Sequence, residues 1–214
     1  MLQCSAQITG PGPGAQQPFP PGRVFPAMRR LERTSLFETP AGFDEPLEML
    51  LGCHRRIEKQ LETLKKLRAH IEAHGVDAEA TAAAQAVLRY FVKAAANHLE
   101  DEEQDLFPLL EQRINDPGEA NRFRAFRDSL ESDHRMLEST WARLRKPLEA
   151  IAEGFTRTLQ PADVQAFVDV YAHHIVAEES VLQEFVDRWL DDRDRQVLGR
   201  AMASRRGVPQ QRAP

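Results

Sequence analysis

The chain has 214 residues, a hydrophobic content of 42% and a formal net charge of −5, which suits one domain with tails and lacks the basic excess of a nucleic-acid-binding protein. No apolar run approaches the ~20 residues that cross a bilayer, and the mean hydropathy is −0.50, so no membrane association is expected. Two cysteines, Cys4 and Cys53, are too few for a disulfide framework and no signal-peptide pattern opens the chain, so a reducing cytoplasm is the expected compartment.

The two ends of the chain are predicted to be disordered. Residues 10–26 read GPGPGAQQPFPPGRVFP, and this density of proline and glycine cannot hold a helix or a central strand. The last residues, GVPQQRAP, are similar in composition. We therefore expect disordered tails over 1–40 and 206–214, with one ordered domain over 41–205.

Capping residues and prolines between the tails mark four long helices and a short fifth helix. The long helices are expected over about 44–75, 77–115, 116–154 and 161–190, and the segment DDRDRQVLGRAMASRR follows them. No alternating run of β-branched residues predicts a strand. The predicted fold class is all-α: an up-down-up-down four-helix bundle with a short C-terminal fifth helix.

One histidine lies on the apolar stripe of each long helix. Of the seven histidines, four are spaced three or four residues from the apolar residues that face the interior of the bundle. They are His54, His98, His134 and His174. A single histidine on such a stripe is most often a core residue, but four of them, one per helix, favour a shared site.

Distances from the turns predict that these four histidines lie in one layer. Residues on antiparallel helices are level when they lie equally far from the shared turn, and His54 and His98 lie about 21 and 23 residues from the first turn, an offset of a few ångströms at ~1.5 Å per residue. The other histidines on the first helix, His70 and His74, lie ~24 Å or more from His54 and are expected at the surface.

Two glutamates are predicted to point into the same layer. Each helical residue advances about 100°, so Glu102, four residues after His98, falls in the middle of its apolar stripe. Glu178 has the same position relative to His174. The neighbouring acids are predicted to lie off the stripe, with Asp101 about 100° away from it and Glu100, Glu103 and Glu179 on outer faces.

The first and third helices provide a contrast. Their apolar stripes lie on the other side of the histidine, so Ile57 and Leu137 occupy the inward position. Glu58 and Glu138, although also four residues after a histidine, are therefore expected on the rim.

Two carboxylates and four imidazoles in one buried layer require compensating charge, because an unpaired buried charge costs several kcal/mol. Two divalent cations of the Mn/Fe/Zn group would supply that charge, and helical-bundle cores with related Glu and His pairs hold di-iron sites. The pattern therefore predicts a metal site of two cations.

The motifs on the four helices resemble those of the haemerythrin-like, HHE cation-binding domain family. They are CHRRIE, HLEDEEQDLFPLL, SDHRML and HHIVAEESVL, and the resemblance covers about residues 44–190. It implies two iron ions in a non-haem di-iron centre. The implied terminal ligands are His54, His98, His134 and His174, and the implied bridging carboxylates are Glu102 and Glu178.

The ligand set separates the chain from the oxygen-carrying branch of this family. Carriers have a fifth histidine from an HxxxH pair on the third helix, whereas Glu138 stands at that position here. The set of four histidines and two glutamates is most similar to the iron-centre-repair branch. That branch has a cysteine-bearing N-terminal domain, where this chain has a Pro/Gly-rich segment with Cys4.

Two functions remain open from the sequence. The first is a di-iron protein that binds or senses O2, NO or peroxide, or that handles iron in a stress response. The second is a non-catalytic helical interaction module whose polar layer holds a structural metal or none. The sequence does not specify protein partners and shows no Ser/His/Asp triad or nucleotide fingerprint, so no catalytic residue is assigned.

Cys53 is interpreted as a packing residue, and Tyr171 as either a core aromatic or a hydrogen-bond donor near the metals.

Overall fold

The computed structural model describes residues 42–208 of the chain. The tails expected over 1–40 and 206–214 lie outside this range, apart from residues 206–208. The described part of the chain is helical and contains no strand. None of its helices is both long enough and apolar enough to span a membrane.

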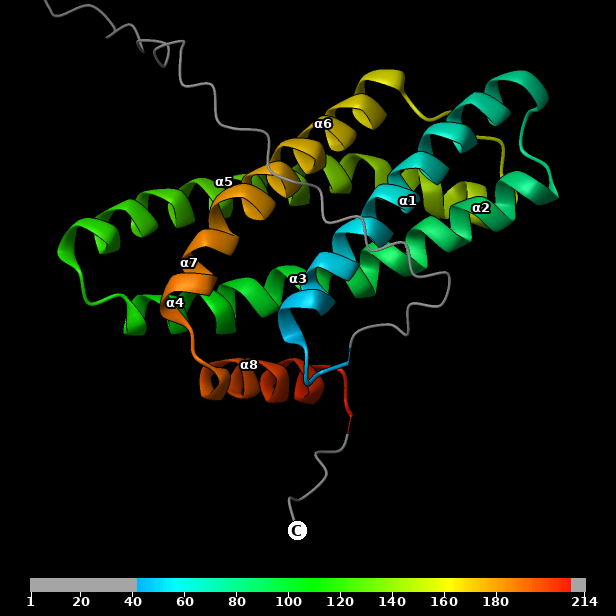
Figure 1. Ribbon diagram of the computed structural model, residues 1–214. Coiled ribbons are helices and arrows are strands. Elements are labelled where there is room, and N and C mark those ends of the chain that lie inside the picture. Colours follow the sequence, from blue (N-terminus) through cyan, green and yellow to red (C-terminus); the bar gives the residue numbers. More distant parts are fainter. Residues whose placement is uncertain (1–41, 209–214) are drawn as a thin grey trace, which may run out of the picture. The chain divides into compact units, whose positions relative to one another are not determined.

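Four long helices form the bundle, and a short fifth helix packs at its side (Figure 1). The first is α1 (Pro46–His74) and the third is α5 (Pro117–Ala152). The second consists of α2 (Ala78–Arg89), η1 (Tyr90–Ala95), α3 (Ala96–Glu100), η2 (Asp101–Leu106) and α4 (Phe107–Arg113). The fourth consists of α6 (Pro161–Ala177), η3 (Glu178–Leu182) and α7 (Gln183–Trp189), and the fifth is α8 (Asp192–Arg205). The predicted all-α bundle is confirmed.

The helix ends are set by residues that the sequence shows plainly. Asp77 and Asp116 accept hydrogen bonds from the backbone N–H groups of Ala80 and Glu119, at 2.9 and 2.8 Å, and so cap α2 and α5. Gly75 ends α1 with a φ of 78°, a conformation that favours glycine. These local signals place the helix ends within about two residues of the predicted boundaries.

The second and fourth helices differ from the other two because they contain π-helical turns. The turns η1, η2 and η3 interrupt otherwise α-helical segments. A π turn spans one more residue than an α turn and is frequent at functional sites. Both segments were expected to be regular α-helices, and no sequence pattern predicted these turns.

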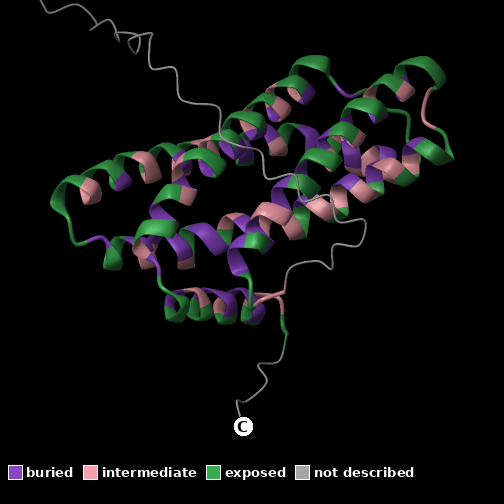
Figure 2. Cartoon of the chain, viewed as in Figure 1, coloured by how far each residue is buried: buried purple, intermediate pink, exposed green. Residues whose placement is uncertain are grey.

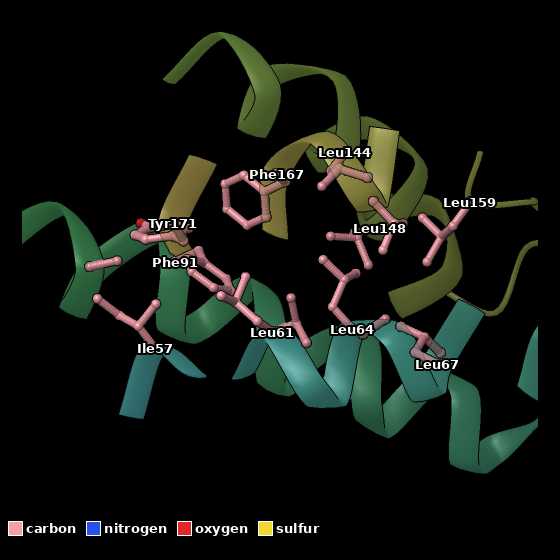
Figure 3. Packing of buried hydrophobic residues seen from close by; sticks show 14 of the residues in the cluster. Ile57, Leu61, Leu64, Leu67, Phe91, Leu144, Leu148, Leu159, Phe167 and Tyr171 are labelled. Carbon is pink, nitrogen blue, oxygen red and sulfur yellow. The ribbon is translucent and has the colours of Figure 1, made fainter. Parts of the chain in front are cut away.

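Two apolar cores fill the bundle, one on each side of a polar layer. Core I consists of the buried hydrophobic residues within 57–71, 80–95, 137–151 and 159–175, and core II of those within 47–50, 106–130 and 182–202. Figure 3 shows part of core I, where leucines of α1 face leucines of α5. Buried residues follow the faces where the helices meet (Figure 2).

The fifth helix covers one side of core II. Leu198 and Met202 of α8 are buried in that core. Gly199 allows close approach, because a Cβ at this position would lie 1.8 Å from the carbonyl oxygen of Phe43. The buried carboxylate of Asp194 accepts a forked hydrogen bond from Arg113 at the end of α4, with distances of 2.6 and 2.9 Å.

Candidate metal centre

Six polar side chains meet where the helices pass from core I to core II. All of them are at most 4% exposed. They are His54 from α1, His98 from α3, Glu102 from η2, His134 from α5, His174 from α6 and Glu178 from η3. These are the six residues that the sequence analysis selected, and we call this group the polar layer.

The polar layer consists of two overlapping groups of four residues. One contains His54, His98 and the two glutamates, and the other contains His134, His174 and the same glutamates. Within each group, one potential ligand atom from every residue lies within 4.8 Å of the others. Glu102 and Glu178 therefore belong to both groups, and each group has two histidines of its own.

The histidine rings approach the shared carboxylates closely. Nε2 of His54 lies 2.8 Å from a Glu178 oxygen, and Nε2 of His174 lies 3.0 Å from the other oxygen. Around Glu102, Nε2 of His98 lies at 3.2 Å and that of His134 at 3.5 Å. Each carboxylate thus faces one histidine from each group.

Most of these facing atoms have no properly aligned hydrogen-bond partner. The Nε2 atoms of all four histidines, one oxygen of Glu102 and both oxygens of Glu178 are buried and unsatisfied. Each such atom costs about 1–3 kcal/mol if it stays unpaired. A divalent cation within each group would satisfy them, and imidazole and carboxylate ligands suit the Mn/Fe/Zn group. The residues therefore fit a pair of cations.

Burial favours the neutral ring that a metal requires of histidine. It lowers the pKa of His98 to about 3 and also lowers that of His134. Both rings are therefore neutral at pH 7 and have a lone pair available for a cation.

The two carboxyl groups differ in their tendency to ionise. Burial, followed by the nearby Glu178 carboxylate, raises the pKa of Glu102 well above its usual range. Burial also opposes the charge of Glu178, but the adjacent His174 and His54 hold its pKa well below the usual range. A cation placed between the two glutamates would favour the ionised form of both.

Two further glutamates orient two of the histidines. Oε1 of Glu179 lies 3.1 Å from Nδ1 of His54, and Oε1 of Glu103 lies 2.5 Å from Nδ1 of His134. Such carboxylate partners fix which ring nitrogen faces a metal. Glu103 and Glu179 lie on outer faces as expected, but the sequence did not indicate that their carboxylates reach these two rings. They lie near the surface, about half exposed, but their side chains are long enough to reach rings on neighbouring helices.

Asp101 also differs from the sequence-based expectation. It lies off the apolar stripe and makes no contact with the polar layer in the hydrogen bonds and ion pairs of the described residues, yet it is fully buried. Arg205 and Arg206 at the end of α8 cover it, with Nη2 of Arg206 at 2.6 Å from its carboxylate. The sequence did not indicate that the fifth helix packs on this face.

The remaining candidates lie where the sequence analysis placed them. Glu58 and Glu138 are exposed, while Ile57 and Leu137 beside them are 0% and 2% exposed. The histidines outside the layer are also away from the site: His74 and His173 are exposed, and His70 pairs with Asp77 at 3.0 Å.

Cys53 and Tyr171 are both buried near the layer. Cys53 accepts a hydrogen bond from Arg56 at 3.1 Å and packs on the α1 side facing α2. The Tyr171 ring centroid lies 6.5 Å from that of His174. Burial raises the pKa of its hydroxyl above the usual range, so the hydroxyl is protonated and can donate a hydrogen bond.

A small void lies against the polar layer on the core II side. Its volume is about 30 Å³, and His54, Glu102 and Glu178 contribute to its lining together with leucines. This is roughly the volume of one water molecule. The layer can therefore accommodate a very small molecule beside three of its potential ligands.

Comparison with known proteins also indicates that the chain binds cations. The family model of the hemerythrin HHE cation-binding domain matches residues 45–186. A protein of Haemophilus influenzae, described as uncharacterized, is 29% identical over 143 residues, which make up 67% of this chain and 80% of the relative. The matched family region includes all six residues of the polar layer.

Proposed function

The chain belongs to the family of hemerythrin HHE cation-binding domains, and on this premise we propose that it is a non-haem di-iron protein that binds or senses a small molecule such as O2, NO or peroxide. Handling of iron in a stress response is the related role that the same site would allow. The family description and the donor set support cation binding, and the choice of iron and of the small ligand is our proposal.

The proposed roles of the residues follow from the two overlapping groups. His54 and His98 would hold one iron and His134 and His174 the other, and Glu102 and Glu178, which belong to both groups, would be shared by the two. Glu179 and Glu103 keep the rings of His54 and His134 in the orientation that directs Nε2 into the layer. The surrounding apolar cores exclude water from the ligands.

A single observation carries the proposal: two fully buried carboxylates are shared by two pairs of histidines, and their facing atoms are unsatisfied. Six protein ligands leave open coordination positions on two irons, where bound iron would supply redox chemistry and a place for a small molecule. The void of about 30 Å³ beside His54, Glu102 and Glu178 matches a diatomic molecule in size.

Metal analysis combined with optical spectroscopy tests the proposal. Protein grown with added iron should contain two irons per chain, and its visible absorption should change when O2, NO or azide is added. A single inert zinc, or no metal at all, would contradict the di-iron proposal and favour a helical interaction module. Two irons with a spectrum that none of the three molecules changes would contradict ligand binding and leave iron handling.

A further inference from the structure

A large cavity opens beside the polar layer and borders core I. It is lined by residues of η1, α3, η2, α5 and α6, and its volume is about 670 Å³. His134 of the polar layer and Tyr171 contribute to its lining. We call it the acidic cavity, for the carboxylates described below.

The acidic cavity is too large to serve a diatomic molecule alone. A molecule of that kind needs about the ~30 Å³ of a water molecule, whereas pockets for organic ligands measure roughly 300–1,000 Å³. The volume of about 670 Å³ falls within the second range. The cavity therefore has the size expected for an organic ligand.

The deep part of the cavity is aromatic. Phe91, Trp141 and Phe167 line it, and their ring centroids lie 5.0 to 5.6 Å from one another. Aromatic faces provide apolar contact and also attract cations. The deep part of the cavity therefore suits the apolar part of a ligand, and a positive charge on that ligand would also be favoured there.

The outer part of the cavity is rich in carboxylates. Four glutamates and one arginine contribute to its lining: Glu100, Glu103, Glu131, Glu138 and Arg135. Arg205 and Arg127 offset part of this charge, at 3.2 Å from Glu100 and 3.4 Å from Glu131. Glu138 forms no ion pair with any residue between 42 and 208, so its charge remains available to a ligand.

A buried polar group adds a second, independent indication of a ligand. Tyr171 is 3% exposed and lines the cavity, and its hydroxyl has no hydrogen-bond partner among the described residues. The side chain is buried as a whole, but its hydroxyl oxygen remains accessible from the cavity. A ligand with a polar head that enters the cavity would supply the missing partner.

We propose that the acidic cavity binds an organic cation, an amine or quaternary ammonium compound with an apolar body. Its apolar body would lie against Phe91, Trp141 and Phe167, and its positive charge near Glu138 and the neighbouring glutamates. This inference goes beyond the proposed function, because the cavity and its charges do not depend on which metal the polar layer holds.

The molecule contains a comparison surface of opposite charge. A groove of similar volume, about 670 Å³, lies between α1 and the η1–α3 region on the other side of the second helix. All its charged lining residues are basic: Arg56, Arg89, Lys93 and Arg206. This groove should therefore repel an organic cation. If an anion binds to the groove, its site is separate from the acidic cavity.

Equilibrium dialysis with two probes of the same aromatic body tests the proposal on the purified protein, with its metal content measured in the same preparation. Benzyltrimethylammonium should bind at one site, at least about tenfold more tightly than benzenesulfonate, which corresponds to roughly 1.4 kcal/mol. Equal binding of the two probes, or no saturable binding of the cation, would overturn the proposal. Because the readout is dialysis, it does not depend on whether iron is found.

Substitutions at matched positions locate the bound cation. Ala96→Phe, in the lining of the acidic cavity, should weaken cation binding by at least tenfold, whereas Ala94→Phe, in the lining of the basic groove, should not. Both alanines are partly buried on the same helix. Glu138→Gln should reduce the preference for the cation over the anion by roughly threefold or more without altering circular dichroism. If Ala96→Phe does not fold, an unchanged preference in Glu138→Gln would by itself overturn the proposal.

Discussion

α1 and α5 are uninterrupted α-helices that each contribute one histidine to the polar layer, whereas the second and fourth helices contain π turns and each contribute a histidine and a glutamate. The glutamates that follow the inward ones, Glu103 and Glu179, contact His134 and His54 on the uninterrupted helices. The two kinds of helix are therefore complementary. The helices with π turns supply the shared carboxylates, and the glutamate that follows each shared carboxylate orients a histidine on an uninterrupted helix. Two of the three π turns, η2 and η3, lie where consecutive glutamates serve these two different purposes.

The largest effect on metal binding is expected when one of the two shared glutamates is replaced. In Glu102→Gln or Glu178→Gln, the shape is kept but a negative charge between two cations is lost. Removing a ligand should weaken metal binding at least as much as the ~10- to 100-fold known for residues around ligands. We expect the loss of one or both metals at unchanged helical content, measured by metal analysis and circular dichroism.

The rim glutamates of the uninterrupted helices are the matched control. Glu58→Gln and Glu138→Gln carry the same chemical change four residues after a histidine, but both side chains are exposed. They should retain both metals. Equal metal loss from this pair would contradict the distinction between the two kinds of helix.

The helix boundaries and the inward or outward position of the glutamates could be predicted from the sequence because they depend on local patterns. Caps such as Asp77 and Gly75 act within one turn, and the apolar stripe alone separates Glu102 from Glu58. The same reasoning missed the π turns, since it assumed the regular advance of about 100° per residue throughout each helix. It also missed the burial of Asp101, because no local pattern shows that Arg205 and Arg206 return to that face from the end of α8. The acidic cavity is a property of three helices together and has no signal in any one of them.

A smaller effect is expected from the glutamates that orient the histidines. Glu103→Ala or Glu179→Ala leaves Nδ1 of one histidine without its partner, and metal affinity should fall by about tenfold, the lower end of the range for such residues. Gln at either position keeps an oxygen that can accept the Nδ1 hydrogen, so its effect should be smaller than that of Ala. Competition with a chelator of known affinity measures the difference.

Glu100 serves as the control for this pair. Its carboxylate is exposed and contacts Arg205 rather than a histidine, so Glu100→Ala should leave the metal affinity unchanged. An equal loss in Glu100→Ala would show that surface charge, and not ring orientation, explains the effect of Glu103.

The fifth helix should affect stability without changing the metal content. Asp194→Asn removes the charged acceptor of Arg113, so the free energy of unfolding should fall. The decrease should be modest, because Arg113 is partly exposed and solvent screens its charge. The hydrogen bond from Arg113 lowers the pKa of Asp194. Its contribution is therefore complete above the unfolded value of about 3.9 and is lost as the pH falls through the lower folded value.

Urea unfolding at two pH values measures this contribution. The wild type and Asp194→Asn should differ in free energy of unfolding at pH 7 and converge once the pH falls below the lowered pKa of Asp194 in the folded protein. Both should contain the same amount of metal, because Asp194 contacts α4 and not the polar layer. A variant that lost metal would indicate that α8 helps to position η2 and Glu102.

The smallest effect is expected at the histidines near the first turn. His70 and His74 lie on α1 like His54, but their ring neighbours are each other and the exposed Asp77. His70→Ala and His74→Ala should leave the metal content unchanged, whereas His54→Ala removes a side chain with Nε2 2.8 Å from Glu178 and should reduce it. All three changes remove an imidazole from the same helix, so any general effect of histidine on metal uptake would appear in all of them. Metal loss restricted to His54→Ala would show that position in the layer, rather than the number of histidines on α1, decides which rings bind metal.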